Sequence, residues 1–350
     1  MLIWPDHFPD PRPLMTHCSL RRLWPALVVA VAAFAGSPAS AGPFSSLVVF
    51  GDSLSDNGNN KLAGLYAPGQ VITGNTYVPS STYLAGTYSN GPVWASDFAA
   101  MIGVPLLPSL GGGGDFAFGG ATTGTPGPGM DGFPYSLLVQ TSQYLAASGN
   151  VASPTALYVV AGGGNDVRAA LDAIGGGADI PTTIAATAAS FAANVGTIVD
   201  QLQAAGAQHI VVWDTPNVGL APAVVAGGGA ALGTFLAGTM NAALAARLSG
   251  EAGVSTFDIF GLGTSIALNP ALYGFTNVSD ACGAIAVANC EQYAYWDGIH
   301  PTAAAHRVIA DAFAVAALPV PEPETWLLLG VGLAALGATA RRRAAAARPA

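Results

Sequence analysis

Short apolar runs that each end in a turn rich in glycine, aspartate or asparagine are the feature that most limits how this chain can fold. Three of them, at residues 46–50, 156–160 and 209–213, are rich in valine and other residues that favour strands. Stretches with apolar residues at helical spacing lie between them. Strands that alternate with helices predict a parallel sheet with helices on both faces, so we expect one doubly wound α/β domain.

Two further strands are expected at residues 104–107 and 254–259, which makes a mostly parallel sheet of five strands. Residues 61–91 show no sustained period and are expected to form a long loop over the functional site. Residues 261–295 are also expected to be irregular. The expected helices cover residues 93–102, 135–147, 182–205, 230–248 and 302–316.

Ser53 belongs to the turn Gly51-Asp52-Ser53, which follows the first apolar run directly. A strand that ends in a glycine turn places the next side chain at the carboxyl edge of the sheet, where open α/β folds build their sites. If a helix begins there, its free N–H groups favour an anion beside Ser53. The same tripeptide is also an ordinary turn with a helix N-cap, so alone it does not decide the function.

A candidate base for Ser53 is His300, one of three histidines after residue 41. Asp297 precedes it by three positions on a turn, and this spacing can bring a carboxylate to the imidazole Nδ1 and leave Nε2 free for a serine. His209 begins an expected strand and reads as structural, whereas His306 lies in the last helix, in the core or on the surface.

Two glycine-rich turns can supply hydrogen-bond donors for an oxyanion. A glycine at position 120 lets a backbone N–H approach a substrate oxygen closely, and Asn165, in a turn after the strand at 156–160, can donate from its amide. Both turns follow expected strands or open helices, at the same edge of the sheet as Ser53.

Four segments together resemble the successive blocks of the GDSL or SGNH hydrolase family. They are residues 50–56, 115–121, 163–166 and 297–300, in the order of the family, and residues 88–94 resemble a segment of its larger, lipase-like branch. The resemblance implies a flavodoxin-like three-layer α/β/α sandwich that needs no metal and no organic cofactor.

The resemblance also implies a role for each matching residue. Ser53 is then the nucleophile, His300 the base and Asp297 the group that orients it. The oxyanion hole consists of the Ser53 N–H, the Gly120 N–H and the Asn165 side chain. Asp115 stands where the family often has asparagine, which puts the second block in doubt and leaves Gly119 as the alternative donor.

The charge balance excludes nucleic acid as a partner. Residues 42–319 hold 16 acidic and 4 basic residues, a net charge of −12. Such a surface repels phosphate backbones.

Both ends of the chain read as sorting signals. Arg21 and Arg22 precede an apolar run at 23–35 and a small-residue cleavage site that ends at Ala41, so residues 1–41 are expected to be a secretory signal peptide. The expected folded domain covers residues 42–319.

The tail, residues 320–350, combines Pro321-Glu322-Pro323, an apolar stretch at 326–340 and the cluster Arg341–Arg343. This order resembles the PEP-CTERM sorting signal, in which an exosortase-type enzyme removes a transient membrane anchor. It implies export in a Gram-negative bacterium, to the periplasm, the cell surface or the extracellular matrix. A plain membrane anchor is the alternative, although 15 residues are short for a spanning helix.

Cys282 and Cys290 are the two cysteines outside the expected signal peptide. In an exported chain an even pair favours a disulfide. No pair of histidines lies near them, so we do not expect a zinc site there.

Two functional hypotheses of different classes remain from the sequence. The first is an exported serine hydrolase that cleaves carboxylic esters, of lipids or of acetylated glycans, through an acyl-enzyme. The second is a non-catalytic binding or structural protein of the exopolysaccharide matrix with the same fold.

Overall fold

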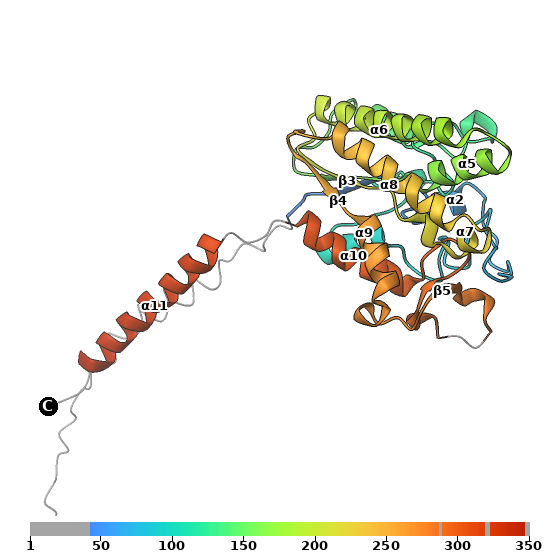
Figure 1. The fold of residues 1–350 in the computed structure, drawn as a ribbon. Helices are drawn as coiled ribbons and strands as arrows, with labels where there is room; N and C mark the ends of the chain where they lie inside the picture. Colours follow the sequence, from blue (N-terminus) through green and yellow to red (C-terminus); the bar gives the residue numbers. More distant parts are fainter. Residues whose placement is uncertain (1–42, 287–288, 319–322, 347–350) are drawn as a thin grey trace, which may run out of the picture. The chain divides into compact units, whose positions relative to one another are not determined.

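The folded domain is built on a sheet of four parallel strands in the order β1-β2-β3-β4. A computed structural model describes residues 43–286, 289–318 and 323–346 (Figure 1). The neighbouring strands pair in register, with Gly51 beside Ala161 and Val212 beside Thr256. The strands are β1 (Leu47–Gly51), β2 (Leu157–Ala161), β3 (His209–Trp213) and β4 (Val254–Phe257).

The expected fifth strand at 104–107 is wrong. Pro105 lies within that stretch and Pro108 follows it directly, and proline cannot donate to a ladder. Residues 114–118 lie along β1 instead, where Val49 donates to Gly114 O at 2.9 Å and Phe116 donates to Val49 O at 2.8 Å. Asp115 forms only isolated bridges, one to Val49 of β1 and one to Pro108, so the segment does not count as a strand.

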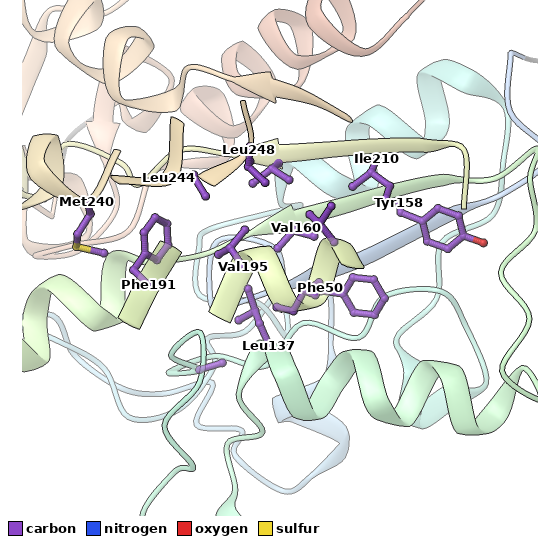
Figure 2. Packing of buried hydrophobic residues seen from close by; sticks show 14 of the residues in the cluster. Phe50, Leu137, Tyr158, Val160, Phe191, Val195, Ile210, Met240, Leu244 and Leu248 are labelled. Atoms are coloured by element: carbon purple, nitrogen blue, oxygen red, sulfur yellow. The ribbon is translucent and has the colours of Figure 1, made fainter. Parts of the chain in front are cut away.

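Helices cover both faces of the sheet and make three layers, as expected for an α/β/α sandwich. One core contains Phe50, Val160 and Phe191 and lies under α4, α5, α6 and α8 (Figure 2). The other contains Val49 and Trp213 and lies under α3 and α10. These helices are α3 (Trp94–Ile102), α4 (Leu137–Ala147), α5 (Gly164–Gly175), α6 (Ile180–Ala204), α8 (Ala230–Arg247) and α10 (Ala303–Ala317) (Figure 1).

The long helix α6 is part of the first core. Asp179 caps its start by accepting from the Thr182 N–H, and Phe191 and Val195 are buried. By length and composition it is the one helix among the described residues that could cross a membrane. Its buried face identifies it as a core helix instead.

The stretch at 261–295 is more regular than expected. It contains the greater part of α9 (Ile259–Leu268) and two short parallel strands, β5 (Asn277–Ala281) and β6 (Tyr293–Tyr295). Cys282 and Cys290 form the expected disulfide. The short helical elements there are η5 (Pro270–Tyr273), η6 (Cys282–Ala284) and η7 (Cys290–Gln292).

Several short elements and the tail helix of 24 residues complete the described chain. The expected signal peptide, residues 1–41, lies outside the described residues, as do 319–322 in front of the tail helix. The remaining elements are α2 (Asn59–Leu62), η2 (Ser109–Gly111), η3 (Met130–Gly132), η4 (Val218–Leu220), α7 (Pro222–Ala226) and α11 (Pro323–Ala346).

Candidate active site

Ser53 lies in a tight turn at the carboxyl end of β1. Asp52 O accepts the N–H groups of Ser55 and Asp56 at 3.0 and 2.9 Å, so the chain coils at once after the strand. Gly51 makes this close turn possible, because a Cβ there would lie 2.9 Å from Ser55 Oγ in the turn, and also 2.9 Å from Ala161 O on β2. Ser53 is 8% exposed and is therefore largely buried.

His300 and Asp297 lie next to Ser53 although 247 residues separate Ser53 from His300. The Ser53 Oγ and His300 Nε2 atoms are 2.9 Å apart, and His300 Nδ1 is 2.8 Å from Asp297 Oδ2. Asp297 is fully buried and His300 is 3% exposed. Thr302 caps α10 directly after this turn, because its Oγ1 accepts the Ala305 N–H at 3.1 Å.

Gly119 and Gly120, the two alternative backbone donors, have different surroundings. Gly119 is buried, and its N–H donates to Asp56 Oδ2 at 3.0 Å. Gly120 is exposed with φ of 87°, and its N–H has no acceptor among the described residues. The Ser53 N–H likewise lacks an acceptor within the described part of the chain. Gly120 therefore has the donor that is free for a ligand.

The Asn165 amide is fixed from both ends at the start of α5. Its Nδ2 donates to Ala121 O at 2.8 Å, and its Oδ1 accepts from Arg168 Nη1 at 3.1 Å. One amide hydrogen is therefore used and the second is available. Arg168 was not singled out by the sequence analysis, although it lies one helical turn after Asn165.

Two buried carboxylates tie these turns together. Asp56 accepts the N–H groups of Gly58, Asn59 and Asn60, besides that of Gly119. Burial raises the pKa of Asp56 to about 6.

Asp115, which stands where the family often has asparagine, also acts as an acceptor. Its oxygens accept the N–H groups of Asn57 and Ala117 at 2.9 and 3.0 Å. Burial raises the pKa of Asp115 well above its ordinary value. The Asp115 carboxylate therefore links residues 115–121 to the chain that follows Ser53, so an asparagine is not needed at this position.

The other two histidines do not contact Ser53. His209 is the first residue of β3, so it lies at the amino end of that strand, away from the carboxyl edge of the sheet. Its ring contacts Phe44. His306 is 1% exposed, and its Nδ1 accepts the Trp94 N–H at 3.3 Å. Burial lowers the pKa of His306 to about 3. His306 is therefore a core residue, which the sequence left open.

An apolar pocket of about 140 Å³ opens beside Ser53 and His300. The start of α5 contributes Asn165 and Arg168, and Asp52 lies at the same end, where burial raises its pKa to about 6. The apolar lining comes from η4, α9 and neighbouring segments and includes Val218, Leu220, Ile259, Leu262, Ile266, Val278 and Ile299.

Sequence reasoning missed α9 as a wall of this pocket. The signal was present, because Ile259, Leu262 and Ile266 recur at the spacing of one helix face. Within residues 43–286, 289–318 and 323–346, no group of three or more histidine, cysteine or acidic side chains is placed to hold a metal ion.

Comparison with known families finds two matches. The family described as GDSL-like Lipase/Acylhydrolase matches residues 47–313, and the PEP-CTERM protein-sorting motif matches residues 319–343. The first match covers most of the chain and all the site residues above. The chain therefore belongs to the GDSL-like lipase/acylhydrolase family and has a PEP-CTERM sorting motif after the folded domain.

Individual relatives carry esterase and lipase names. The chain is 29% identical over 329 residues to Esterase EstA of Pseudomonas aeruginosa, covering 78% of this chain and 47% of that protein. It is 32% identical over 183 residues to Lipase 1 of Photorhabdus luminescens, covering 52% of this chain and 24% of that protein. The chain thus spans half or less of the length of these relatives.

Among solved structures, a carbohydrate acetylesterase from Sinorhizobium meliloti is similar at 15% identity with a TM-score of 0.41. The match covers 77% of this chain and 98% of that protein.

Proposed function

We propose that this protein is an exported serine hydrolase that cleaves carboxylic esters through an acyl-enzyme. The observation that carries the proposal is the hydrogen-bonded series from Ser53 Oγ through His300 to Asp297, with links of 2.9 and 2.8 Å. It lies beside backbone donors that have no acceptor among the described residues. A nucleophile, a base, an orienting carboxylate and an oxyanion site are the parts that acyl transfer needs.

In the proposed reaction, Ser53 Oγ attacks the ester carbonyl carbon while His300 Nε2 takes the hydroxyl proton. The negative oxygen of the tetrahedral intermediate accepts hydrogen bonds from the Ser53 N–H, the Gly120 N–H and the Asn165 amide. The carbon–oxygen bond to the alcohol then breaks, and His300 returns its proton to the leaving oxygen. In the second half His300 takes a proton from water, whose oxygen attacks the acyl carbon. The bond from that carbon to Ser53 Oγ then breaks, and His300 returns the proton to Ser53 Oγ as the acid leaves.

The lining of the pocket supports an acyl chain longer than acetyl as the preferred group. Each methylene buried among Leu220, Ile266 and Val278 would contribute about 0.8 kcal/mol, or about fourfold in kcat/KM. A glycan acetyl group would leave most of these side chains without a partner. We therefore favour lipid esters over acetylated glycans.

The activity test uses Ser53→Ala with p-nitrophenyl acetate, butyrate and octanoate. We expect the variant to lose at least about 10³ in kcat while its circular dichroism stays that of the parent. A fluorophosphonate should label the parent on Ser53 and fail to label the variant. Turnover that survives in Ser53→Ala, or a folded parent without turnover on any ester, refutes the proposal. The second result favours a non-catalytic matrix protein.

The preference for longer chains is tested on α9. Ile266→Trp fills the pocket and should reduce kcat/KM for octanoate at least about tenfold relative to acetate. Leu268→Trp is the matched control, because Leu268 is on the same helix but 74% exposed and outside the pocket lining. Equal losses on both esters would contradict an acyl pocket here.

We also propose that both ends are removed during export. The mature domain would begin near Gly42 and lose the tail after Pro323, which an exosortase-type enzyme cuts while the C-terminal helix holds the chain transiently in the membrane. The PEP-CTERM match at 319–343 supports this order of events. Intact mass of the exported protein tests it, and a full-length product would contradict it.

A further inference from the structure

We propose that Tyr83 is a positioning residue of this site, whose hydroxyl holds the Asp297 carboxylate in the orientation that His300 requires. The inference rests on the proposed function and adds a fourth side chain to the series Ser53–His300–Asp297. Tyr83 belongs to the long loop at 61–91, which the sequence predicts to lie over the functional site.

Asp297 receives four hydrogen bonds, two on each oxygen. Its Oδ1 accepts the backbone N–H groups of Ile299 and His300, both at 2.8 Å. Its Oδ2 accepts from His300 Nδ1 at 2.8 Å and from the Tyr83 hydroxyl at 2.8 Å. A carboxylate offers about four lone-pair sites, so this one is saturated. Three donors come from the turn of Asp297 itself, and only Tyr83 comes from elsewhere in the described chain.

Tyr83 is fixed independently of Asp297. Tyr83 is 4% exposed, and its ring and that of Trp296 pack nearly perpendicular to each other with centroids 5.6 Å apart. Its N–H donates to Thr87 O and its O accepts from Gly86, both at 2.9 Å, so a closed turn holds the backbone. Burial and the negative charge of Asp297 raise the pKa of Tyr83, so its hydroxyl stays a donor.

The same loop is fastened to the segment around Asp297 at other points. Gly298 N donates to Tyr77 O at 3.0 Å, and Ala281 N donates to Asn75 Oδ1 at 2.9 Å. Tyr83 is the only one of these contacts that ends on the Asp297 carboxylate. It therefore links the loop to the reacting groups themselves, whereas the others hold the backbone.

Removing the Tyr83 hydroxyl leaves Oδ2 with one donor. The carboxylate charge then acts more strongly on the His300 ring, because no second donor competes for that oxygen, and the protonated ring is stabilised. His300 accepts the serine proton only in its neutral form. The acid limb of kcat/KM against pH should therefore move upward by about one pH unit, the lower end of what one hydrogen bond to a charged group contributes.

Other titratable groups near His300 stay in place in such a variant. Asp52 lies beside Ser53, Tyr88 packs on the His300 ring with centroids 5.2 Å apart, and His306 is on α10. Tyr77 is another tyrosine near Asp297, and its hydroxyl donates to Gln70 Oε1 at 2.5 Å within the loop. Tyr77→Phe is therefore a matched control that removes a hydroxyl from the same loop but none from Asp297.

The experiment compares Tyr83→Phe, Tyr77→Phe and the parent by pH–rate profiles and proton NMR. We expect the acid limb to move upward in Tyr83→Phe only. In a Ser53→Ala background, which needs no turnover, the downfield proton shared by His300 and Asp297 should move further downfield when Tyr83 is changed to phenylalanine. An unchanged profile and an unchanged proton signal would overturn the inference while leaving the proposed function intact. Turnover in Ser53→Ala would instead overturn the proposed function.

A second variant covers the case in which Tyr83→Phe does not fold. A fluorinated tyrosine at position 83 keeps the ring and the hydroxyl but makes the hydroxyl a stronger donor. The acid limb should then move downward, opposite to the effect of phenylalanine. A shift of the same sign in both variants, or none in the fluorinated one, would contradict a positioning role for this hydrogen bond.

Discussion

Replacing His306 by asparagine should make the free energy of unfolding less sensitive to acid. His306 is 1% exposed and uses Nδ1 to accept the Trp94 N–H at 3.3 Å. An asparagine Oδ1 can accept from the same N–H, so the substitution removes the titrating group and keeps the hydrogen bond. Burial lowers the pKa of His306 from 6.5 to about 3 in the folded protein.

The size of the effect follows from proton linkage. Below pH 6.5 the unfolded chain binds a proton at this position, whereas the folded chain binds it only near pH 3. The stability that a neutral His306 contributes is therefore complete above pH 6.5 and is lost as the pH falls. Between about pH 7.5 and pH 4.5 the loss is about 3 kcal/mol.

Asp52 and Asp56 change the free energy of unfolding in the opposite direction to His306 as the pH falls. Burial raises the pKa of each from 3.8 to about 6, so the folded state takes up these protons first as the pH falls. Each stabilises the fold by about 2 kcal/mol over the same range, so the two together offset the loss from His306. The pH dependence of the unfolding free energy of the parent alone therefore does not reveal the contribution of His306.

The assay is urea unfolding of the parent and His306→Asn at several pH values, with equal denaturant slopes as the check that the unfolding transition is comparable. We expect the difference in unfolding free energy to change by about 3 kcal/mol in favour of the variant on going from about pH 7.5 to pH 4.5. A difference that is constant with pH would refute the reasoning.

Three further outcomes are expected. Asn165→Ala should lower kcat by about 10²–10³ with little change in KM, measured on one p-nitrophenyl ester, and an effect confined to KM would contradict a role at the oxyanion. Gly119→Ala should lower the Tm and the activity together, because the new Cβ would lie 2.1 Å from Cε2 of Tyr88, and a Tm like that of the parent would contradict this packing. Replacing Cys282 and Cys290 together by alanine should cost about 2–3 kcal/mol in urea unfolding, and two free thiols by mass in the native exported protein would contradict the bridge.

The parts of the fold that the sequence predicted well depend on local patterns. The run at 209–213 corresponds to β3, and the serine, histidine and glycine turns lie where strands end or helices begin. Residues 50–56 and 163–166 come together because the parallel strands β1 and β2 bring their carboxyl ends to one edge of the sheet. Residues 115–121 and 297–300 do not follow strands of this sheet and reach the same place through contacts between distant residues.

The parts that were missed depend on contacts between distant residues. Residues 114–118 lie beside β1 through hydrogen bonds to Val49, while the more apolar 104–107 does not form a strand. The Tyr83 hydroxyl bonds a carboxylate 214 residues away, and no local period marks it. Helix α9 has an apolar stripe but contains Gly261 and Gly263, which weaken the helical signal.

The carboxylate of Asp56 joins backbone N–H groups from two separate turns, one after Ser53 and one at Gly119. The spacing between those turns is therefore set when the chain folds and needs no rearrangement when a substrate arrives. Helix α9, which lines the neighbouring pocket, takes no part in this junction. If the proposed function is right, the residues that set the turnover rate and those that select the ester therefore belong to separate segments of the chain. Substitutions on α9 can then redirect the protein to another ester while its turnover is preserved, so residues 259–268 are the place at which to engineer new specificities.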